Sequence, residues 1–316
     1  MKFLFKKILF SCFLLAGLAG CIKEDRTECN PGVVLKYDYS LNKENTNLFG
    51  AEVGKVTVYV FDADGFYYDS FTGEGSHLTN DYRMHLPLPA GDYTAVVWGG
   101  ALGTYRLGEV VPGKAAFQEG LKKGGTRLEN FMLLAEKGEQ SLNELDALWH
   151  GVARVASVYQ VKEPVTVNLM KNTKLLTVKV KDKSIAGGDV AGEMPYEVYC
   201  EGKNGRYMAD NSFGKNAQSV VYVPNSVELE PSMMTARLDL LRLVEGHELR
   251  VVVADRKRSI LFNKDLIEEL LRLGRLDNQV ELDREDEVEI IVNIDKNVIV
   301  SVTINGWNVV EVIPDL

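Results

Sequence analysis

Apolar and polar side chains alternate along most of the chain beyond residue 30, and this period of two restricts the fold to one built from β-strands. The segments 33–39 (VVLKYDY) and 56–61 (VTVYVF) carry an apolar or aromatic residue at alternate positions, as half-buried strands do. Helical periodicity is scarce. Further strands are expected at 66–71, 92–98, 126–134, 165–169, 175–180, 196–201, 206–210, 219–223, 235–243, 249–254 and 288–294.

The length favours two domains, because 316 residues of which 46 % are apolar can build more than one core. The strand pattern pauses around 160–164 and then resumes, which places a boundary near residue 170. We therefore expect an all-β fold of two tandem β-sandwiches, one at 31–170 and one at 171–316, with one short helix in the second.

Three dipeptides mark tight turns between strands. Asp64-Gly65 and Asn204-Gly205 are expected to close hairpins, because type I′ turns need positive φ at both central positions. Asn305-Gly306 is expected to divide a C-terminal strand pair at 297–313 in the same way. Calcium binding by Asp62 and Asp64 is the alternative, but the further oxygen ligands of a calcium loop are missing, so the turn is favoured.

One helix interrupts the strands of the second half. Leu266, Ile267, Leu270 and Leu271 share a helical face, which is expected to pack on a sheet. Asn263 is expected to cap the start of this helix, and Gly274 to end it. One or two helical turns are also expected at 141–148.

The N-terminus reads as an export signal. Three lysines precede an apolar run of about a dozen residues, far short of the roughly 20 that span a bilayer. The run closes on Leu18-Ala19-Gly20-Cys21, the type of sequence that the lipoprotein signal peptidase reads. We expect cleavage between Gly20 and Cys21 and lipid on Cys21, so that 1–20 is a signal peptide and 21–30 a lipidated tether. The alternative is an ordinary secretory signal cut at another small residue.

A short charged motif follows the expected lipid site. Lys23, Glu24 and Asp25 resemble the surface-export tag of lipoproteins from anaerobic Gram-negative bacteria. The resemblance implies an outer-membrane lipoprotein exposed at the cell surface. The alternative is a solvated polar tether without a targeting role.

Charge and cysteine content fit an exported protein. Loss of 1–20 would remove three lysines and no acid, which changes the net charge from −9 to −12, so we expect no nucleic-acid partner. Once Cys12 leaves with the signal and Cys21 is lipidated, Cys29 and Cys200 remain. They could form a disulfide, but two idle thiols are the favoured interpretation.

No catalytic motif is present, so we expect no enzyme, no metal site and no cofactor apart from the lipid on Cys21. His150 lies four residues after Asp146, but no other histidine or cysteine completes a ligand set. We interpret it as a loop or interdomain histidine.

The C-terminal strand pair is the candidate contact with a partner. An edge strand rich in Val and Ile aggregates unless something pairs with it or covers it. Strand addition to a neighbouring subunit would cover it; burial as the last strand of its own domain is the simpler alternative. The candidate partner-binding residues are Val298, Val300, Val302, Ile304, Val309 and Val310.

Taken together, these motifs resemble the fimbrillin-associated anchor family, the FimB-type subunits of fimbriae from such anaerobes. The resemblance covers nearly the whole mature chain. It rests on Cys21 and the acidic residues that follow it, and on DRTECNPGVVLKYDY at 25–39, VTVYVFDADGFY at 56–67, LPAGDYTAVVWGG at 88–100, LWHG at 148–151 and INGW at 304–307.

The resemblance implies two sandwiches of transthyretin-like or immunoglobulin-like type, held by lipid in the outer membrane at the base of a fimbrium. The implied partner is the fimbrial stalk subunit, or major fimbrillin. Stalk subunits of this system lose their first strand to a protease, usually arginine-directed, whereas an anchor keeps it. After Arg26 the next arginine is Arg83, so the first expected strands contain no arginine to cut. The alternative function is a surface glycan-binding lipoprotein that uses Tyr67, Tyr68 or Trp149 for stacking.

Overall fold

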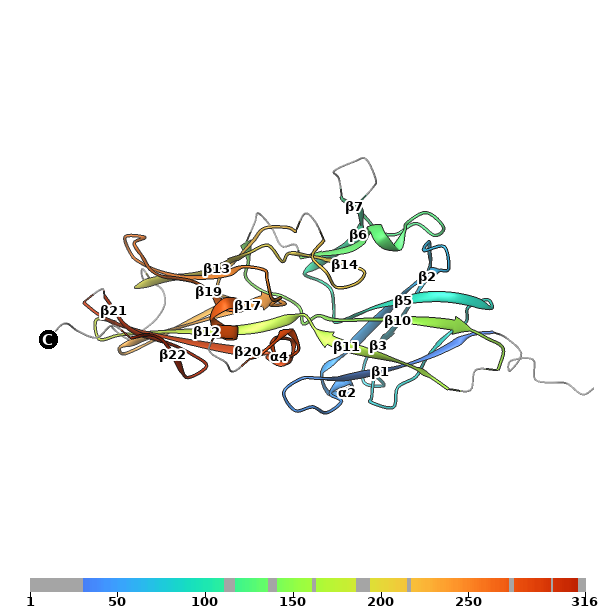
Figure 1. The fold of residues 1–316 in the computed structure, drawn as a ribbon, viewed down its shortest axis with the longest axis horizontal. Coiled ribbons are helices and arrows are strands. Elements are labelled where there is room, and N and C mark those ends of the chain that lie inside the picture. The colour runs from blue at the N-terminus through green and yellow to red at the C-terminus, as the bar shows by residue number, and fades with distance from the viewer. Residues whose placement is uncertain are drawn as a thin grey trace, which may run out of the picture.

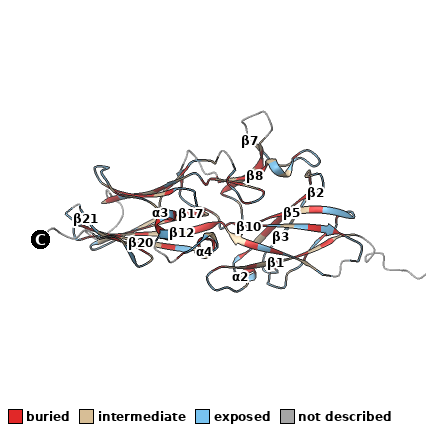
Figure 2. Cartoon of the chain, viewed as in Figure 1, coloured by how far each residue is buried: buried red, intermediate tan, exposed pale blue. Residues whose placement is uncertain are grey.

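The computed structural model describes residues 31–110, 117–135, 141–160, 163–185, 194–214, 217–272, 276–296 and 298–311. These residues form four β-sheets arranged along one long axis (Figure 1). The predicted all-β class is confirmed. Buried side chains run along the inner faces of the strands, and exposed ones lie on the outer faces and turns (Figure 2).

The N-terminal half is centred on a seven-stranded sheet in the order β3-β2-β5-β10-β11-β1-β4. Its first strand, β1, is parallel to β11, while the other neighbours are antiparallel. One face buries a core that includes Leu35, Val58 and Val97. The strands are β1 (Val33–Leu41), β2 (Lys55–Asp62), β3 (Tyr67–Glu74), β4 (Met84–Leu86), β5 (Gly91–Gly99), β10 (Trp149–Ser157) and β11 (Val165–Lys171).

A four-stranded sheet covers part of the opposite face, in the order β14-β8-β6-β7. Phe131 of β8 packs against Phe61 of β2, with ring centroids 5.3 Å apart. Three of its strands come from the first half of the chain, but β14 comes from the second half, so the two halves share this sheet. The strands are β6 (Tyr105–Val110), β7 (Phe117–Glu119), β8 (Phe131–Ala135) and β14 (Arg206–Met208).

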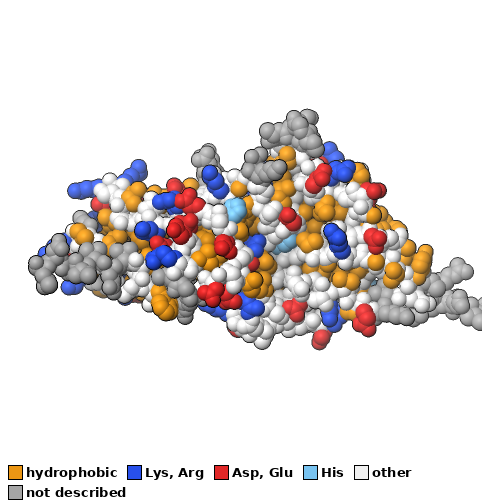
Figure 3. Space-filling view, in the orientation of Figure 1, with side chains coloured by type: hydrophobic (Ala, Val, Ile, Leu, Met, Phe, Trp, Pro, Cys, Tyr) orange, Lys and Arg blue, Asp and Glu red, His pale blue; other side chains and the backbone are white. Residues whose placement is uncertain are grey.

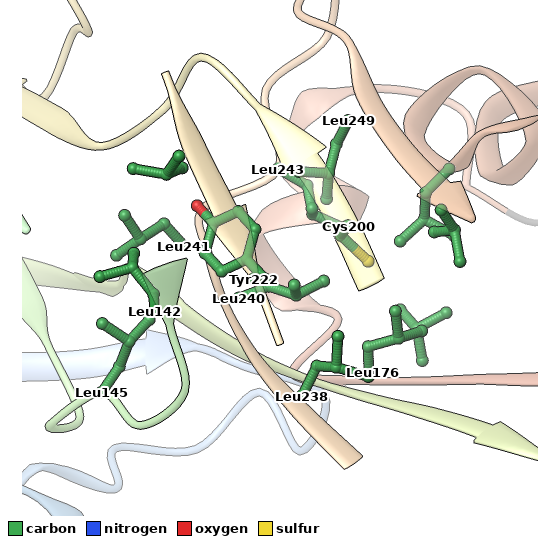
Figure 4. Packing of buried hydrophobic residues seen from close by; sticks show 14 of the residues in the cluster. Leu142, Leu145, Leu176, Cys200, Tyr222, Leu238, Leu240, Leu241, Leu243 and Leu249 are labelled. Atoms are coloured by element: carbon green, nitrogen blue, oxygen red, sulfur yellow. The ribbon is translucent and has the colours of Figure 1, made fainter. Parts of the chain in front are cut away.

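The C-terminal half is a sandwich of two sheets around a large aliphatic core (Figure 4). A six-stranded sheet has the order β16-β17-β12-β20-β21-β22, and a five-stranded sheet the order β19-β18-β13-β15-β9. The first consists of β12 (Thr173–Asp182), β16 (Ser226–Glu230), β17 (Met233–Leu241), β20 (Glu287–Asp295), β21 (Val298–Ile304) and β22 (Trp307–Glu311). The second consists of β9 (Ser141–Leu142), β13 (Tyr196–Gly202), β15 (Val220–Tyr222), β18 (Leu249–Asp255) and β19 (Ile260–Asp265).

Within the described ranges, three short α-helices accompany the strands: α2 (Phe49–Glu52), α3 (Leu266–Arg272) and α4 (Gln279–Arg284). The predicted helix is confirmed as α3, which buries Leu266, Ile267 and Leu270. The predicted cap is wrong, because Asp265 accepts the Ile267 N–H at 3.0 Å while Asn263 lies inside β19. Gly274 lies outside the described residues.

The helix predicted at 141–148 is wrong. Ser141 and Leu142 form β9, which pairs in parallel with β15. The Asp239 carboxylate then accepts the Leu145 N–H, and the Asp146 carboxylate accepts the Thr104 N–H. These long-range bonds replace the local bonds of a helix.

Two of the three predicted hairpins are confirmed. Asn305 and Gly306 both have positive φ, as a type I′ turn between β21 and β22 requires. The β2–β3 hairpin turns at Asp64-Gly65, but only Gly65 has positive φ, so the type I′ geometry predicted there is wrong. Its turn is held instead by Asp62, whose carboxylate accepts the N–H groups of Asp64 and Phe66.

The Asn204-Gly205 hairpin is wrong. Neither residue has positive φ, and β14 pairs with β8 rather than with β13. The Asn204 side chain is buried, where it accepts the Tyr222 hydroxyl proton and donates to the Arg242 carbonyl. Since Asn204 serves as a core hydrogen-bonding group, it does not form a turn.

A charged cluster joins the two halves. Lys174, whose side chain is fully buried, donates to the Asp283 carbonyl at 2.7 Å and to the Asp286 carboxylate at 3.1 Å. Burial lowers the pKa of Lys174, and Asp286 opposes that shift. Asp286 also accepts the Tyr39 hydroxyl proton and pairs with Lys171, so it links β1 and β11 to β12.

We expect Asp286→Ala to lower the free energy of unfolding by about 3–5 kcal/mol, because it leaves the buried Lys174 ammonium without its carboxylate. Lys171→Ala, which removes a partly exposed partner of the same carboxylate, should cost less than about 1 kcal/mol. Urea denaturation measures both. The double variant Asp286→Ala/Lys174→Met should recover most of the loss; equal costs for the two single variants would contradict this account of the junction.

Candidate subunit interface

The expected lipid site and export tag precede the described chain. Gly20, Cys21, Lys23, Glu24 and Asp25 all lie outside the described residues. The first described contact is a bridge between Gly32 and Val158, after which β1 begins at Val33. The described chain thus begins at one end of the long axis and ends, after β22, at the other (Figure 1).

The first strand is an integral part of its sheet. On one side β1 pairs with β11, and on the other its first three residues pair with β4. Past the end of β4, the Asn47 side chain bonds to the free edge of β1 in place of a strand. Its oxygen accepts the Tyr39 N–H at 2.9 Å, and its amide donates to the Tyr37 carbonyl at 3.2 Å. Sequence reasoning missed Asn47; the signal available was the Asn-rich loop at 42–47 next to a strand.

The six-stranded sheet has two unlike edges. One edge, β16, carries Glu228 and Glu230, and charged edge residues of this kind oppose pairing with another chain. The other edge, β22, has the sequence WNVVE, and Trp307 is 51 % exposed. Because an apolar edge is a template for a further strand, β22 is the candidate interface.

The predicted partner-binding residues divide into two groups. Val298 and Val300 are exposed, whereas Val302 and Ile304 are buried in the core and are not available to a partner. Val309 is partly buried against that core. Val310 pairs with Val302 through the backbone, and its side chain is not described.

The other candidate residues have structural positions. His150 lies in β10 rather than in a loop, and its Nε2 is 2.9 Å from the Ala209 carbonyl oxygen, across the contact between the two halves. Cys200 is a buried free thiol, and burial raises its pKa; Cys29 lies outside the described residues. Among the described residues no cluster of three or more His, Cys, Asp or Glu side chains forms a metal site.

The expected glycan-stacking platform is largely absent. Tyr67 and Trp149 are buried, so two of the three aromatic residues predicted to stack on a sugar ring are inaccessible. Tyr68 is 36 % exposed, but its ring makes an edge contact with Tyr93, at 5.7 Å between centroids. In the part of the chain that the structure describes, no helix is long and apolar enough to cross a membrane.

Comparisons with known proteins agree with this fold. The family described as fimbrillin-A associated anchor proteins Mfa1 and Mfa2 matches residues 26–313. A curated relative, the minor fimbrium anchoring subunit Mfa2 of Porphyromonas gingivalis, is 24 % identical over 93 % of this chain and 91 % of its own.

Two solved structures are similar over most of their length. The fimbrial anchor protein Mfa2 from Porphyromonas gingivalis has a TM-score of 0.70 at 22 % identity, over 89 % of this chain and all of its own. A candidate polysaccharide-binding protein from Bacteroides thetaiotaomicron has a TM-score of 0.74 at 27 % identity, over 88 % of this chain and 96 % of its own. Both support the tandem β-sandwich prediction.

We expect His150 to make stability depend on pH. Burial, the largest cause, lowers the pKa of His150 to about 4, so the unfolded state binds a proton more readily than the folded state. The corresponding stability is fully present above pH 6.5 and is lost as the pH falls toward 4, by about 3 kcal/mol at most.

Urea denaturation of His150→Gln between pH 7 and 4 tests this pH dependence. The variant should lose less stability over that range than the wild-type protein, while the control His85→Gln, at an exposed histidine, should follow the wild-type curve. Parallel curves for wild type and His150→Gln would show that His150 is not the titrating group.

Proposed function

This chain belongs to the family of fimbrillin-A associated anchor proteins Mfa1 and Mfa2, and we propose that it is a minor subunit that anchors a fimbrium to the outer membrane. The observation that carries the proposal is the position of the two chain ends. The N-terminal strand begins at one end of the elongated molecule, and the apolar edge strand β22 runs along the side of the C-terminal sandwich (Figure 1). The N-terminal end can therefore attach to a membrane while the C-terminal sandwich holds a filament.

The membrane attachment in this proposal is lipid on Cys21. Each buried methylene contributes about 0.8 kcal/mol, so a single acyl chain binds reversibly and stable attachment needs at least two. Lipidation that adds both an amide-linked and a thioether-linked lipid meets that requirement. Nine residues lie between Cys21 and Pro31, and this segment reaches at most about 35 Å, which keeps the first sheet near the membrane. Lys23, Glu24 and Asp25 would direct the protein to the cell surface.

The filament contact in this proposal is strand pairing with the stalk subunit at β22. Strand addition gives a ladder of backbone hydrogen bonds, and the alternating side chains set its register. The retained first strand supports this division of roles: β1 pairs with β11 from Leu35 to Leu41 and with β4 over its first three residues, so the first-strand position of this sheet is filled by the chain itself. The charged β16 edge is the disfavoured alternative.

We expect Cys21→Ala to release fimbriae into the medium, because the anchor would lose its lipid while its partner contact remained. Immunoblotting of cell and medium fractions for the stalk subunit measures the release. Cys200→Ala is the matched control, since it removes a buried free thiol and leaves the lipid site intact. Fimbriae that stay on Cys21→Ala cells would contradict the lipid anchor.

We expect Trp307→Lys to reduce copurification of the stalk subunit at least tenfold, because it places a charge on the β22 edge. Trp307 is 51 % exposed, so the free energy of unfolding should change by less than about 0.5 kcal/mol. Tyr159→Lys is the control, since Tyr159 is 63 % exposed near the opposite end. A loss with Tyr159→Lys, or none with Trp307→Lys, would place the stalk contact elsewhere.

A further inference from the structure

A cleft of about 530 Å³ opens between the two sheets of the C-terminal sandwich, on the side away from β22. The five-stranded sheet contributes Tyr196 and Val198, and the six-stranded sheet contributes Val227, Met234 and Ala236. Tyr196 and Met234 stand at the ends of β13 and β17 that lie farthest from the N-terminal half. The cleft therefore opens at the end of the sandwich that lies farthest from the N-terminal half.

Two arginines stand at the mouth of this cleft. Arg256 and Arg258 line it, and both are exposed in the turn between β18 and β19. In the described chain neither guanidinium forms an ion pair, although the protein has a net charge of −9. Figure 3 shows Lys and Arg side chains gathered at the tip of this hairpin.

The turn that carries the two arginines is tightly built. The Asp255 carboxylate accepts the N–H groups of Lys257 and Ser259, each at 2.8 Å, and the Asp255 carbonyl accepts the Arg258 N–H at 2.8 Å. Arg258 has a φ of 62°, which tightens the turn. Asp255 therefore stabilises the turn, and the turn places Arg256 and Arg258 at the rim of the cleft.

We propose that this cleft binds an extended segment of a partner protein that carries carboxylates beside apolar side chains. The apolar walls would bury the apolar side chains, and the guanidinium groups would form bidentate hydrogen bonds with the carboxylates. Glu197 and Asp255 also line the cleft, but the Asp255 carboxylate already accepts two backbone N–H groups of the turn. The acidic groups of the segment must therefore lie against the guanidinium groups of Arg256 and Arg258 and away from Glu197. A basic or neutral segment would gain the apolar contacts but not the charged ones.

This site goes beyond the anchor role and is separate from the β22 edge. The six-stranded sheet has β16 at one edge and β22 at the other, and the cleft lies by β16 and β17. The C-terminal sandwich thus offers two distinct contacts: backbone pairing at one edge of the six-stranded sheet and recognition of acidic side chains near the other.

Fluorescence anisotropy with labelled peptides tests the site, using the mature chain with Cys21→Ala to keep it soluble. The probe is an alternating Glu-Val octapeptide, with Lys-Val and Thr-Val octapeptides as comparisons. We expect the Glu-Val peptide to bind at least tenfold more tightly than either comparison. The affinity of the Glu-Val peptide should fall as the salt concentration rises from about 0.05 to about 0.5 M, because salt screens the attraction between exposed charges over this range.

Charge reversal at the rim should abolish this preference. Arg256→Glu and Arg258→Glu should each weaken Glu-Val binding at least tenfold, and Val227→Asp should do so from inside the cleft. Lys181→Glu is the matched control, because Lys181 is exposed on the neighbouring strand β12 and does not line the cleft. Circular dichroism confirms that each variant is folded.

Equal binding of acidic and basic peptides, no binding of the acidic peptide, or an equal loss in Lys181→Glu would overturn the proposal. The assay needs neither lipid nor a fimbrium. Its failure would therefore leave the anchor function standing, and failure of the anchor function would leave this assay unchanged.

Discussion

One buried residue, Asn172, connects the two principal sheets, and the mechanical unity of the molecule depends on it. Strand β11 ends at Lys171 and β12 begins at Thr173. The Asn172 N–H donates to the Leu148 carbonyl at 2.6 Å, and its side chain exchanges two hydrogen bonds with Asn211. Because only this hydrogen-bonded residue separates them, β11 and β12 form one nearly continuous element.

Parallel strand pairing on both sides of Asn172 would let this element transmit a pulling force. β1 is parallel to β11, and β20 is parallel to β12. A pull on the start of β1 would pass across one ladder into β11, through Asn172 into β12, and across a second ladder into β20. Force along the strands loads many backbone hydrogen bonds in shear, so no single bond carries it. Lys174 and Asp286 brace the same junction.

The sequence predicted correctly those strands and turns that depend mainly on neighbouring residues. The alternation at 175–180 and 288–294 located strands within β12 and β20, and Asn305-Gly306 formed the expected turn, because backbone preference at two residues suffices for it. One or two helical turns were expected at 141–148, but Leu142, Leu145 and Leu148 are buried in the core shared with distant strands. The hairpin predicted at Asn204-Gly205 was wrong for the same reason, because Asn204 is hydrogen-bonded to residues distant in the sequence.

The candidate interface could be predicted only in part. The apolar C-terminal pair was visible in the sequence, whereas its place at a sheet edge depends on the strand order, which alternation does not encode. The cleft of the C-terminal sandwich was missed because its walls come from β13, β16 and β17, which are separated in the sequence.

The central claim is that lipid at the N-terminal end and a filament on the C-terminal sandwich are joined through this strand path. Mass spectrometry of the N-terminal peptide of the protein purified from fimbriated cells tests it most directly. The account predicts that the peptide begins at Cys21 and carries both amide-linked and thioether-linked lipid. A peptide that begins at another residue, or at Cys21 with a free thiol, would contradict it.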